Sequence, residues 1–455
     1  MSATNSQASD AGSLRSMLRR VAILSSGTTL SHVLLFALSP LLSRLFTPAS
    51  FAVFGFHQAA LAVLALLMTL QYDAAIPLPK DDGEARWLLG LALRIGGMIA
   101  GALTLAALGW GFTPWANLLW LPAAILILLP LCALGEAVAR SYRLMCVRHG
   151  HFPAMSQARV IQAAVMGTSH VVTGCLGWIT LGLPLGDALG RWVSAAWFVW
   201  SCRSSKNAAA AASTVVTPPS IDWPEFRRLL CQYARFPVFV TPGVVLALLI
   251  NVFPSLLLPW LYGDQFAGQF ALANRSVLMP LLIISQAVTH VYVSDAAKCV
   301  RHRNADLRLL IRRTAWQMGA GGLLLAGTAA VTGPLLFPIV FGPQWHVAGE
   351  IVPLLAISAF GQFVGGPVNQ ILVLLGKETR KLMLHLAGLL GVGMAFLGSA
   401  WLGLGPIQAT GVYASTILVI QGMYLWQSLV MVEEQVGYWE VEANLAGTAA
   451  QSMAA

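Results

Sequence analysis

Long apolar stretches constrain the fold of this chain more than any other feature. Each is long enough to cross the hydrocarbon core of a bilayer as a helix, which takes about 20 residues. Hydrophobic residues make up 57% of the chain and charged residues only 10%, whereas a soluble domain carries about 25% charged residues. We therefore predict an all-α, polytopic integral membrane protein with about 12 transmembrane helices. The twelve predicted spans are 21–43, 51–70, 87–110, 117–139, 157–179, 183–202, 236–261, 265–294, 315–341, 347–375, 382–403 and 407–431.

The distribution of positive charge predicts the orientation. Of the 27 Lys and Arg residues, 23 fall in segments that share one side of the membrane. The four exceptions are Arg44 at an outer helix end, and Arg94, Arg191 and Arg275 inside spans. Because Lys and Arg concentrate in cytoplasmic loops, we predict that both termini are cytoplasmic. Residues 1–17 are expected to be a disordered cytoplasmic tail and residues 433–455 a second cytoplasmic tail.

The chain divides into two halves. A segment rich in Ala, Ser, Thr and Pro at 203–235 predicts a flexible cytoplasmic linker. It separates a six-helix lobe at 18–202 from a second at 236–432. The region after Leu45 can be laid over the region after Leu261 at a constant offset of 216, which places Gln58 on Asn274. Repeated halves of this kind are typical of transporters that rock about a central site.

Arg275 is the residue that most needs an explanation. It follows Asn274 within the apolar span 265–294. A charge inside a membrane helix costs about 3 kcal/mol or more. We expect Arg275 and Asn274 to face a polar cavity that binds an anion, with Gln58 at the matching position of the first half; the alternative is an Arg275 that only pairs with a neighbouring helix.

Two other arginines have open interpretations. Arg94 lies about two turns inside its span, so it either faces the cavity or extends its side chain to the headgroups. Arg44 is either an interface anchor or a residue at the outer mouth of the cavity.

Four further charged residues occur in pairs spaced by four, so each pair shares a helix face. Asp187 and Arg191 are expected to form a structural ion pair, with a ligand site as the alternative. Glu136 and Arg140 are expected to form a helix-end salt bridge, with a gate as the alternative. Asp73 follows the second span, where we expect an exposed cytoplasmic turn; the alternatives are a proton carrier and a partner of a basic residue.

Catalytic and metal-binding patterns are missing from the sequence. It contains no HExxH, GxSxG, Walker or DxD motif, its histidines are scattered, and its six cysteines form no CxxC pair. We expect a protein that is not an enzyme, with no metal site, no cofactor and no nucleic-acid partner.

Several segments together resemble the bacterial polysaccharide (O-antigen- and exopolysaccharide-type) flippases of the multidrug/oligosaccharidyl-lipid/polysaccharide exporter superfamily. The resemblance covers about residues 18 to 430, and Ala52 departs from it where that family usually has glycine. The segments are Ser39–Pro48 with Phe51 and Phe54, Tyr72–Asp82, Arg235–Pro237, Leu261–Gly263, Ala273–Arg275 and Phe341–Trp345.

The resemblance implies two six-helix lobes around a central cavity in the bacterial inner membrane. It also implies alternating-access movement of polyprenyl-pyrophosphate-linked oligosaccharide repeat units between leaflets, for surface polysaccharide (lipopolysaccharide or exopolysaccharide) biosynthesis. Arg275 matches a position of the kind thought to hold the pyrophosphate, and Arg44 is a second, weaker match. Membrane lipid and other polysaccharide-assembly proteins would be partners of a monomeric flippase.

Two alternatives stay open. A cation-coupled multidrug antiporter of the same superfamily would favour acidic residues in mid-span, whereas Arg94, Arg191 and Arg275 outnumber Asp187 here. A membrane glycan polymerase or ligase would need larger outer loops and catalytic motifs, so we rank it last.

Overall fold

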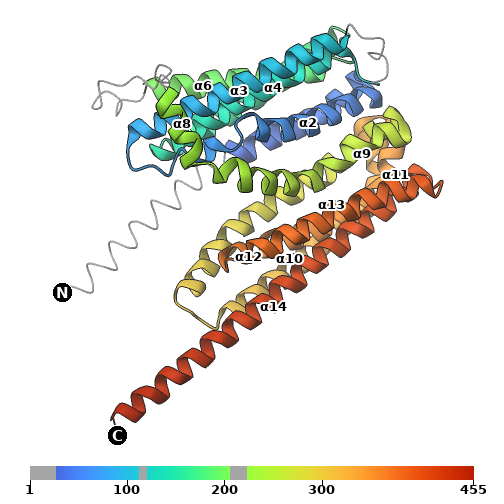
Figure 1. Ribbon diagram of the computed structural model, residues 1–455. Coiled ribbons are helices and arrows are strands. Elements are labelled where there is room, and N and C mark those ends of the chain that lie inside the picture. Colours follow the sequence, from blue (N-terminus) through green and yellow to red (C-terminus); the bar gives the residue numbers. More distant parts are fainter. Residues whose placement is uncertain (1–26, 112–119, 205–222, 455) are drawn as a thin grey trace. The chain divides into compact units, whose positions relative to one another are not determined.

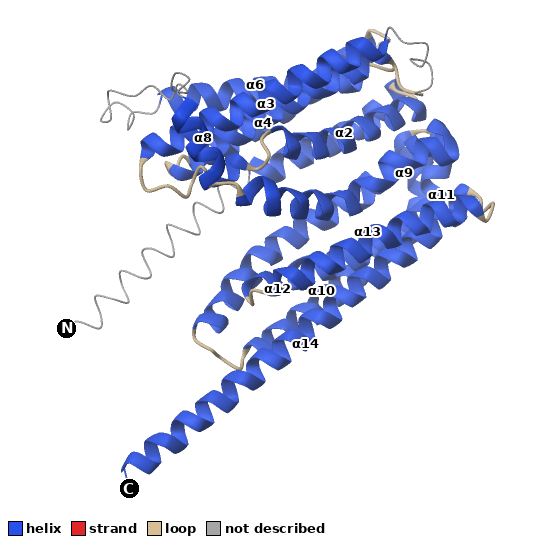
Figure 2. Ribbon diagram, in the orientation of Figure 1, coloured by secondary structure: helices blue, strands red, loops and turns tan. Residues whose placement is uncertain are grey.

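The computed structural model describes residues 27–111, 120–204 and 223–454, and all the regular elements in these ranges are helices (Figures 1 and 2). The predicted tail at 1–17, most of the predicted linker and the first residues of the fourth predicted span lie outside the described residues. The chain forms two compact units, Met1–Leu248 and Leu249–Ala455.

The first unit contains the helices from Gly27 to the start of α9. A helix at Gly27–Leu45 is followed by a sharp break, where Thr47 caps α2 by accepting a hydrogen bond from the Ser50 N–H. The elements after it are α2 (Pro48–Met68), η1 (Tyr72–Ala75), α3 (Asp82–Gly111), α4 (Ala123–Arg148), α5 (Phe152–Cys175), α6 (Gly182–Ser204), α8 (Trp223–Gln232) and η3 (Phe236–Val240).

The long helix α9 (Thr241–Arg301) begins in the first unit and continues into the second. The elements that follow are α10 (Leu307–Phe341), η4 (Pro343–Trp345), α11 (His346–Val368), α12 (Ile371–Leu374), α13 (Glu378–Trp401) and α14 (Pro406–Ala454). The last helix therefore runs through the predicted C-terminal tail. There Glu433 and Glu440 form ion pairs with Arg308 at the start of α10, and Glu442 forms one with Arg303 in the turn before α10.

Nine helical stretches among the described residues are long and apolar enough to cross a membrane. One of them, Phe236–Arg301, bends at Gly263, where φ is 81° and ψ is 164°. It therefore holds both predicted spans 236–261 and 265–294. Helices α5 and α6, 24 and 23 residues long, overlap the predicted spans 157–179 and 183–202 but are not among these nine stretches. In α6, Asp187 and Arg191 lower the mean hydropathy.

Two glycines permit a bend and a turn within the second unit. Gly263 and Gly342, with φ of 81° and 109°, adopt a backbone conformation that residues with a Cβ rarely reach. Gly263 separates the halves of α9, and Gly342 separates α10 from η4. Both lie in segments that carry the family resemblance, so part of that resemblance reflects the geometry of the backbone.

Helix contacts follow the same order in both units. In the first unit α4 packs against α3 and α6, and α6 packs against α5. In the second unit α11 packs against α10 and α14, and α14 packs against α13. The offset of 216 residues also places Thr47, where the helix Gly27–Leu45 gives way to α2, on Gly263, where α9 bends. The weak sequence repeat thus coincides with a repeat of helix packing.

The buried cysteines Cys146 and Cys202 provide a test of this packing. They lie near the ends of α4 and α6 with their Sγ atoms 3.2 Å apart. Because a disulfide needs about 2.05 Å and its atoms are already adjacent, mild oxidation with copper phenanthroline should join these two thiols. Peptide mass spectrometry without reduction would detect the product. Cys132, buried on α4, should stay unlinked, and a Cys146 that links to any other cysteine would contradict the packing of α4 against α6.

Candidate functional site

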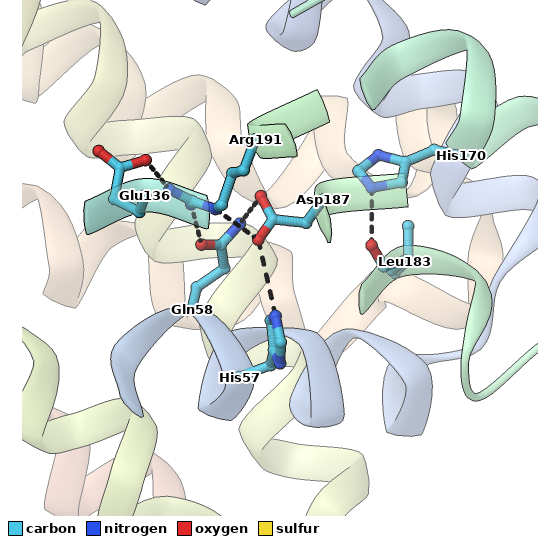
Figure 3. Close-up of polar contacts among 7 residues, drawn as sticks. All are labelled: His57, Gln58, Glu136, His170, Leu183, Asp187 and Arg191. Carbon is cyan, nitrogen blue, oxygen red and sulfur yellow. Dashed lines mark hydrogen bonds and ion pairs between the residues drawn. The ribbon is translucent and has the colours of Figure 1, made fainter. Parts of the chain in front are cut away.

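A buried polar cluster joins three helices of the first unit, and Arg191 lies at its centre (Figure 3). Arg191 Nε on α6 donates to Asp187 Oδ2 at 2.8 Å, one turn earlier on the same helix. Its Nη1 donates to Glu136 Oε2 on α4 at 2.6 Å, and its Nη2 donates to Gln58 Oε1 on α2 at 3.0 Å. One guanidinium therefore holds α2, α4 and α6 together.

Asp187 is the most enclosed charge of the cluster, with 1% of its surface exposed. Gln58 Nε2 donates to Asp187 Oδ1 at 3.1 Å, so Gln58 contacts both members of the Asp187–Arg191 pair. His57, which is 0% exposed, places its Nε2 3.6 Å from Asp187 Oδ2. At that distance the ring interacts with the carboxylate through its charge when protonated and is too far for a good hydrogen bond.

The cluster contains two carboxylates and one guanidinium, so these three groups together carry a net charge of −1. Charge interactions are strong in a low-dielectric interior, and an uncompensated charge there is costly. The excess negative charge of the cluster would therefore attract a cation rather than an anion. Among the described residues, no group of three His, Cys, Asp or Glu side chains is arranged to hold a metal ion.

Small residues bring α6 close to its neighbours. A Cβ added at Gly186 would lie 2.3 Å from the His170 ring on α5, and one added at Gly190 would lie 2.9 Å from Met166. His170 Nε2 lies 2.8 Å from the carbonyl oxygen of Leu183 at the start of α6, as Figure 3 shows. Close packing against α5 thus fixes the turn of α6 that carries Asp187 and Arg191.

A second buried ion pair anchors the loop after α2. Asp73 in η1 is 0% exposed, and Arg140 on α4 contacts both of its carboxylate oxygens, with Nη2 donating to Oδ1 at 2.8 Å. Thr69 Oγ1 also donates to Asp73 Oδ1 at 2.8 Å. The prediction of an exposed turn at Asp73 was therefore wrong, because the chain turns back against α4 and carries this carboxylate inside.

Glu136 and Arg140 do not pair with each other, contrary to the prediction from their spacing. Both lie on one face of α4, but each finds a nearer partner on another element: Glu136 contacts Arg191 on α6, and Arg140 contacts Asp73 in η1. The other predicted pair, Asp187 with Arg191, does form contacts at the four-residue spacing.

Asp73 and Asp82, at opposite ends of the segment between α2 and α3, give a matched test of burial. Asp73 pairs with Arg140, whereas Asp82, 67% exposed, pairs with Arg148 at 2.7 Å. Asp73→Ala should lower the free energy of unfolding by about 3–5 kcal/mol, since it leaves the partly buried Arg140 without its carboxylate partner. Asp82→Ala should cost at most about 1 kcal/mol. Thermal unfolding in detergent measures both, and equal shifts would contradict the burial of Asp73.

The remaining predicted binding residues lie apart along the chain. Arg275 is partly buried on α9, 12 residues after the bend at Gly263, and Asn274 precedes it. Arg94 is partly buried on α3, and Arg44 is exposed at the end of the helix Gly27–Leu45. Gln58 belongs to the cluster of Figure 3. The structure thus joins Gln58 with the predicted Asp187–Arg191 pair.

Sequence reasoning missed His57 and the contact between Glu136 and Arg191. A signal was present: His57 and Gln58 are adjacent polar residues in the otherwise apolar α2, and Glu136 lies 12 residues inside the end of α4. Polar residues so placed need partners within the helix bundle. Their identity depends on which helices are neighbours.

No family model matches the chain, and no curated protein sequence matches it. Solved structures are similar in fold. One is a multidrug resistance MATE family transporter of the MOP superfamily in an inward-facing conformation, with 12% identity, TM-score 0.62, and coverage of 92% of this chain and 98% of that chain. The lipid II flippase MurJ has 11% identity, TM-score 0.65 and coverage of 92% of both chains. A MATE transporter of Vibrio cholerae has 15% identity, TM-score 0.60, and coverage of 93% and 98%.

These similarities cover nearly the full length of each chain at very low sequence identity, so they define the fold alone. The protein is a multi-pass, all-helical membrane protein with the fold of MOP-superfamily transporters. That fold is shared by a multidrug resistance transporter and by a lipid II flippase, so the substrate of this chain has to be argued from its own residues.

Proposed function

We propose that the protein flips polyprenyl-pyrophosphate-linked oligosaccharide repeat units across the bacterial inner membrane by alternating access, for surface polysaccharide biosynthesis. The observation that carries this proposal is Arg275. It is a partly buried arginine inside a membrane-spanning helix, α9, in a segment that resembles the polysaccharide flippases.

The position of Arg275 suits an anionic substrate. Twelve residues separate it from the bend at Gly263, which corresponds to about 18 Å along a helix axis. The hydrocarbon core is about 30 Å thick. Arg275 therefore lies at a depth inside the hydrocarbon core, where the low dielectric strengthens the attraction between a guanidinium and an anion. The planar guanidinium also matches two phosphate oxygens.

Asn274 supports a substrate with many hydroxyl groups. Its Oδ1 is buried and accepts no hydrogen bond from any residue in the ranges that the structure describes. A buried acceptor without a donor is costly, by about 1–3 kcal/mol. A sugar hydroxyl would supply that donor beside the pyrophosphate held by Arg275, while the prenyl tail stays in lipid.

One observation favours a cation-coupled multidrug antiporter as the second candidate. The sequence alone suggests an excess of mid-span arginine, yet Arg191 is compensated by both Asp187 and Glu136. The cluster of Figure 3 therefore carries more carboxylates than arginines, and cations rather than anions would be attracted to it. The same cluster could instead couple a cation gradient to flipping, so it does not exclude the first candidate.

A cell-based experiment separates the two candidates. A strain that lacks the protein should accumulate lipid-linked oligosaccharide in the inner leaflet and lose surface polysaccharide, and the wild-type chain should restore it. An antiporter would instead change the efflux of organic cations such as ethidium. Normal surface polysaccharide in the deletion strain, together with reduced ethidium efflux, would overturn the flippase proposal.

A further inference from the structure

Two arginines near the turn between α4 and α5 have no role in the sites described above. Arg143 lies five residues before the last residue of α4, and Arg159 lies seven residues after the first residue of α5. The two helices are joined by a short turn, so these positions are at similar depth, about 8–10 Å from the helix ends. Both side chains are partly buried.

Neither guanidinium forms a hydrogen bond or an ion pair within the described ranges of the chain. The helices that carry them, α4 and α5, contact each other, and Glu136 lies two helical turns before Arg143 on the same face of α4. Each guanidinium has five N–H donors, and ten donors without an acceptor at a partly buried position are unfavourable.

The nearby carboxylates are already engaged. Glu136 accepts from Arg191 at 2.6 Å, and Asp73 accepts from Arg140 and Thr69. Counting Arg140, Arg143, Arg159 and Arg191 against Asp73, Glu136 and Asp187, this part of the unit keeps one positive charge in excess. The excess falls on Arg143 and Arg159, because every other member of the set has a direct partner.

We propose that Arg143 and Arg159 form a binding site for a phosphate-type anion. Two guanidinium forks on adjacent helices present paired donors to tetrahedral phosphate oxygens, and a bound dianion would compensate both charges. The site rests on the proposed function only for the source of the anion. The pyrophosphate of a lipid-linked oligosaccharide is one source, and the phosphate of a phospholipid headgroup is the other.

Labelling of arginines in the purified wild-type protein tests the site without relying on a variant. A dicarbonyl reagent such as phenylglyoxal modifies accessible arginines, and peptide mass spectrometry gives the rate at each one. Inorganic pyrophosphate at saturating concentration should slow labelling at Arg143 and Arg159 by at least fivefold, and leave Arg227, which is exposed on α8, unchanged. Equal labelling of Arg143 and Arg159 with and without pyrophosphate would overturn the site.

Variants and lipid probes complete the experiment. In titrations with inorganic pyrophosphate, Arg143→Gln and Arg159→Gln should each raise Kd at least tenfold, and the control Arg227→Gln less than twofold. The source of the anion is identified by repeating the arginine labelling in detergent micelles that contain either polyprenyl pyrophosphate or phosphatidylglycerol. Protection of Arg143 and Arg159 by polyprenyl pyrophosphate alone indicates the transported lipid. Protection by phosphatidylglycerol alone indicates a bound phospholipid. Kd values unchanged in both folded variants would overturn the site.

This outcome is separable from that of the proposed function. Protection of Arg143 and Arg159 in a protein that flips no lipid-linked oligosaccharide would support the site and remove the proposed function. Flipping by a protein in which neither arginine is protected would do the reverse.

Discussion

Replacing Arg191 by alanine is expected to lower the free energy of unfolding by about 3–5 kcal/mol, because the change leaves two carboxylates on adjacent helices without their cation. Asp187 is almost completely buried, and both it and Glu136 lie within 3 Å of the guanidinium. The same substitution removes the ion pair with Glu136 that connects α6 to α4, and the hydrogen bond to Gln58. Thermal unfolding of the purified protein in detergent, followed by tryptophan fluorescence, measures the loss.

The chain offers a matched control for this prediction. Arg228 also contacts a carboxylate on its own helix, Glu225, at 2.6 Å, but 58% of its side chain is exposed. Arg228→Ala should therefore cost no more than about 1 kcal/mol. If the two variants unfold at the same temperature, the cluster of Figure 3 does not hold the first unit together.

Replacing Arg275 by alanine should abolish surface polysaccharide while the amount of protein in the membrane stays unchanged. The reason is that Arg275 would lose its contact with the transported pyrophosphate, a charge-assisted interaction that a neutral side chain cannot replace. Arg275→Lys, which keeps the charge and loses the planar fork, should retain a fraction of the output. Quantitative immunoblotting of the protein and gel analysis of the glycan give the two readings.

Arg301 is the control for Arg275, because it lies on the same helix at an exposed position near the end. Arg301→Ala should leave the polysaccharide at the wild-type level. Normal polysaccharide from Arg275→Ala would remove the role proposed for that residue, and the second candidate function would then be favoured.

Much of the helical architecture was predictable from the sequence. Apolar length and the position of prolines and glycines give the helices, since a backbone in lipid has to satisfy its hydrogen bonds internally. The bend at Gly263 and the turn at Gly342 occur where the apolar spans end. The spacing of Asp187 and Arg191 was enough to predict their contact, because residues four apart in a helix are neighbours.

Contacts between helices were not predictable in the same way. Spacing indicated that Glu136 and Arg140 share a face of α4, but which partner each takes depends on the helices packed against that face. Asp73 seemed exposed because it follows an apolar span, and only the return of the loop to α4 explains its burial. The comparison of mid-span arginines with Asp187 likewise omitted Glu136. This second carboxylate makes the cluster around Arg191 net negative.

The most direct test of the central claim is a flipping assay with purified protein in liposomes that contain a fluorescent polyprenyl-pyrophosphate-linked oligosaccharide. Dithionite or a glycosidase added outside reports the fraction of that lipid in the outer leaflet. We predict that wild-type protein equilibrates the substrate between leaflets and that the Arg275→Ala protein does so at the rate of empty liposomes. Wild-type protein that leaves the lipid in place, yet exchanges organic cations for protons or sodium ions, would contradict the account.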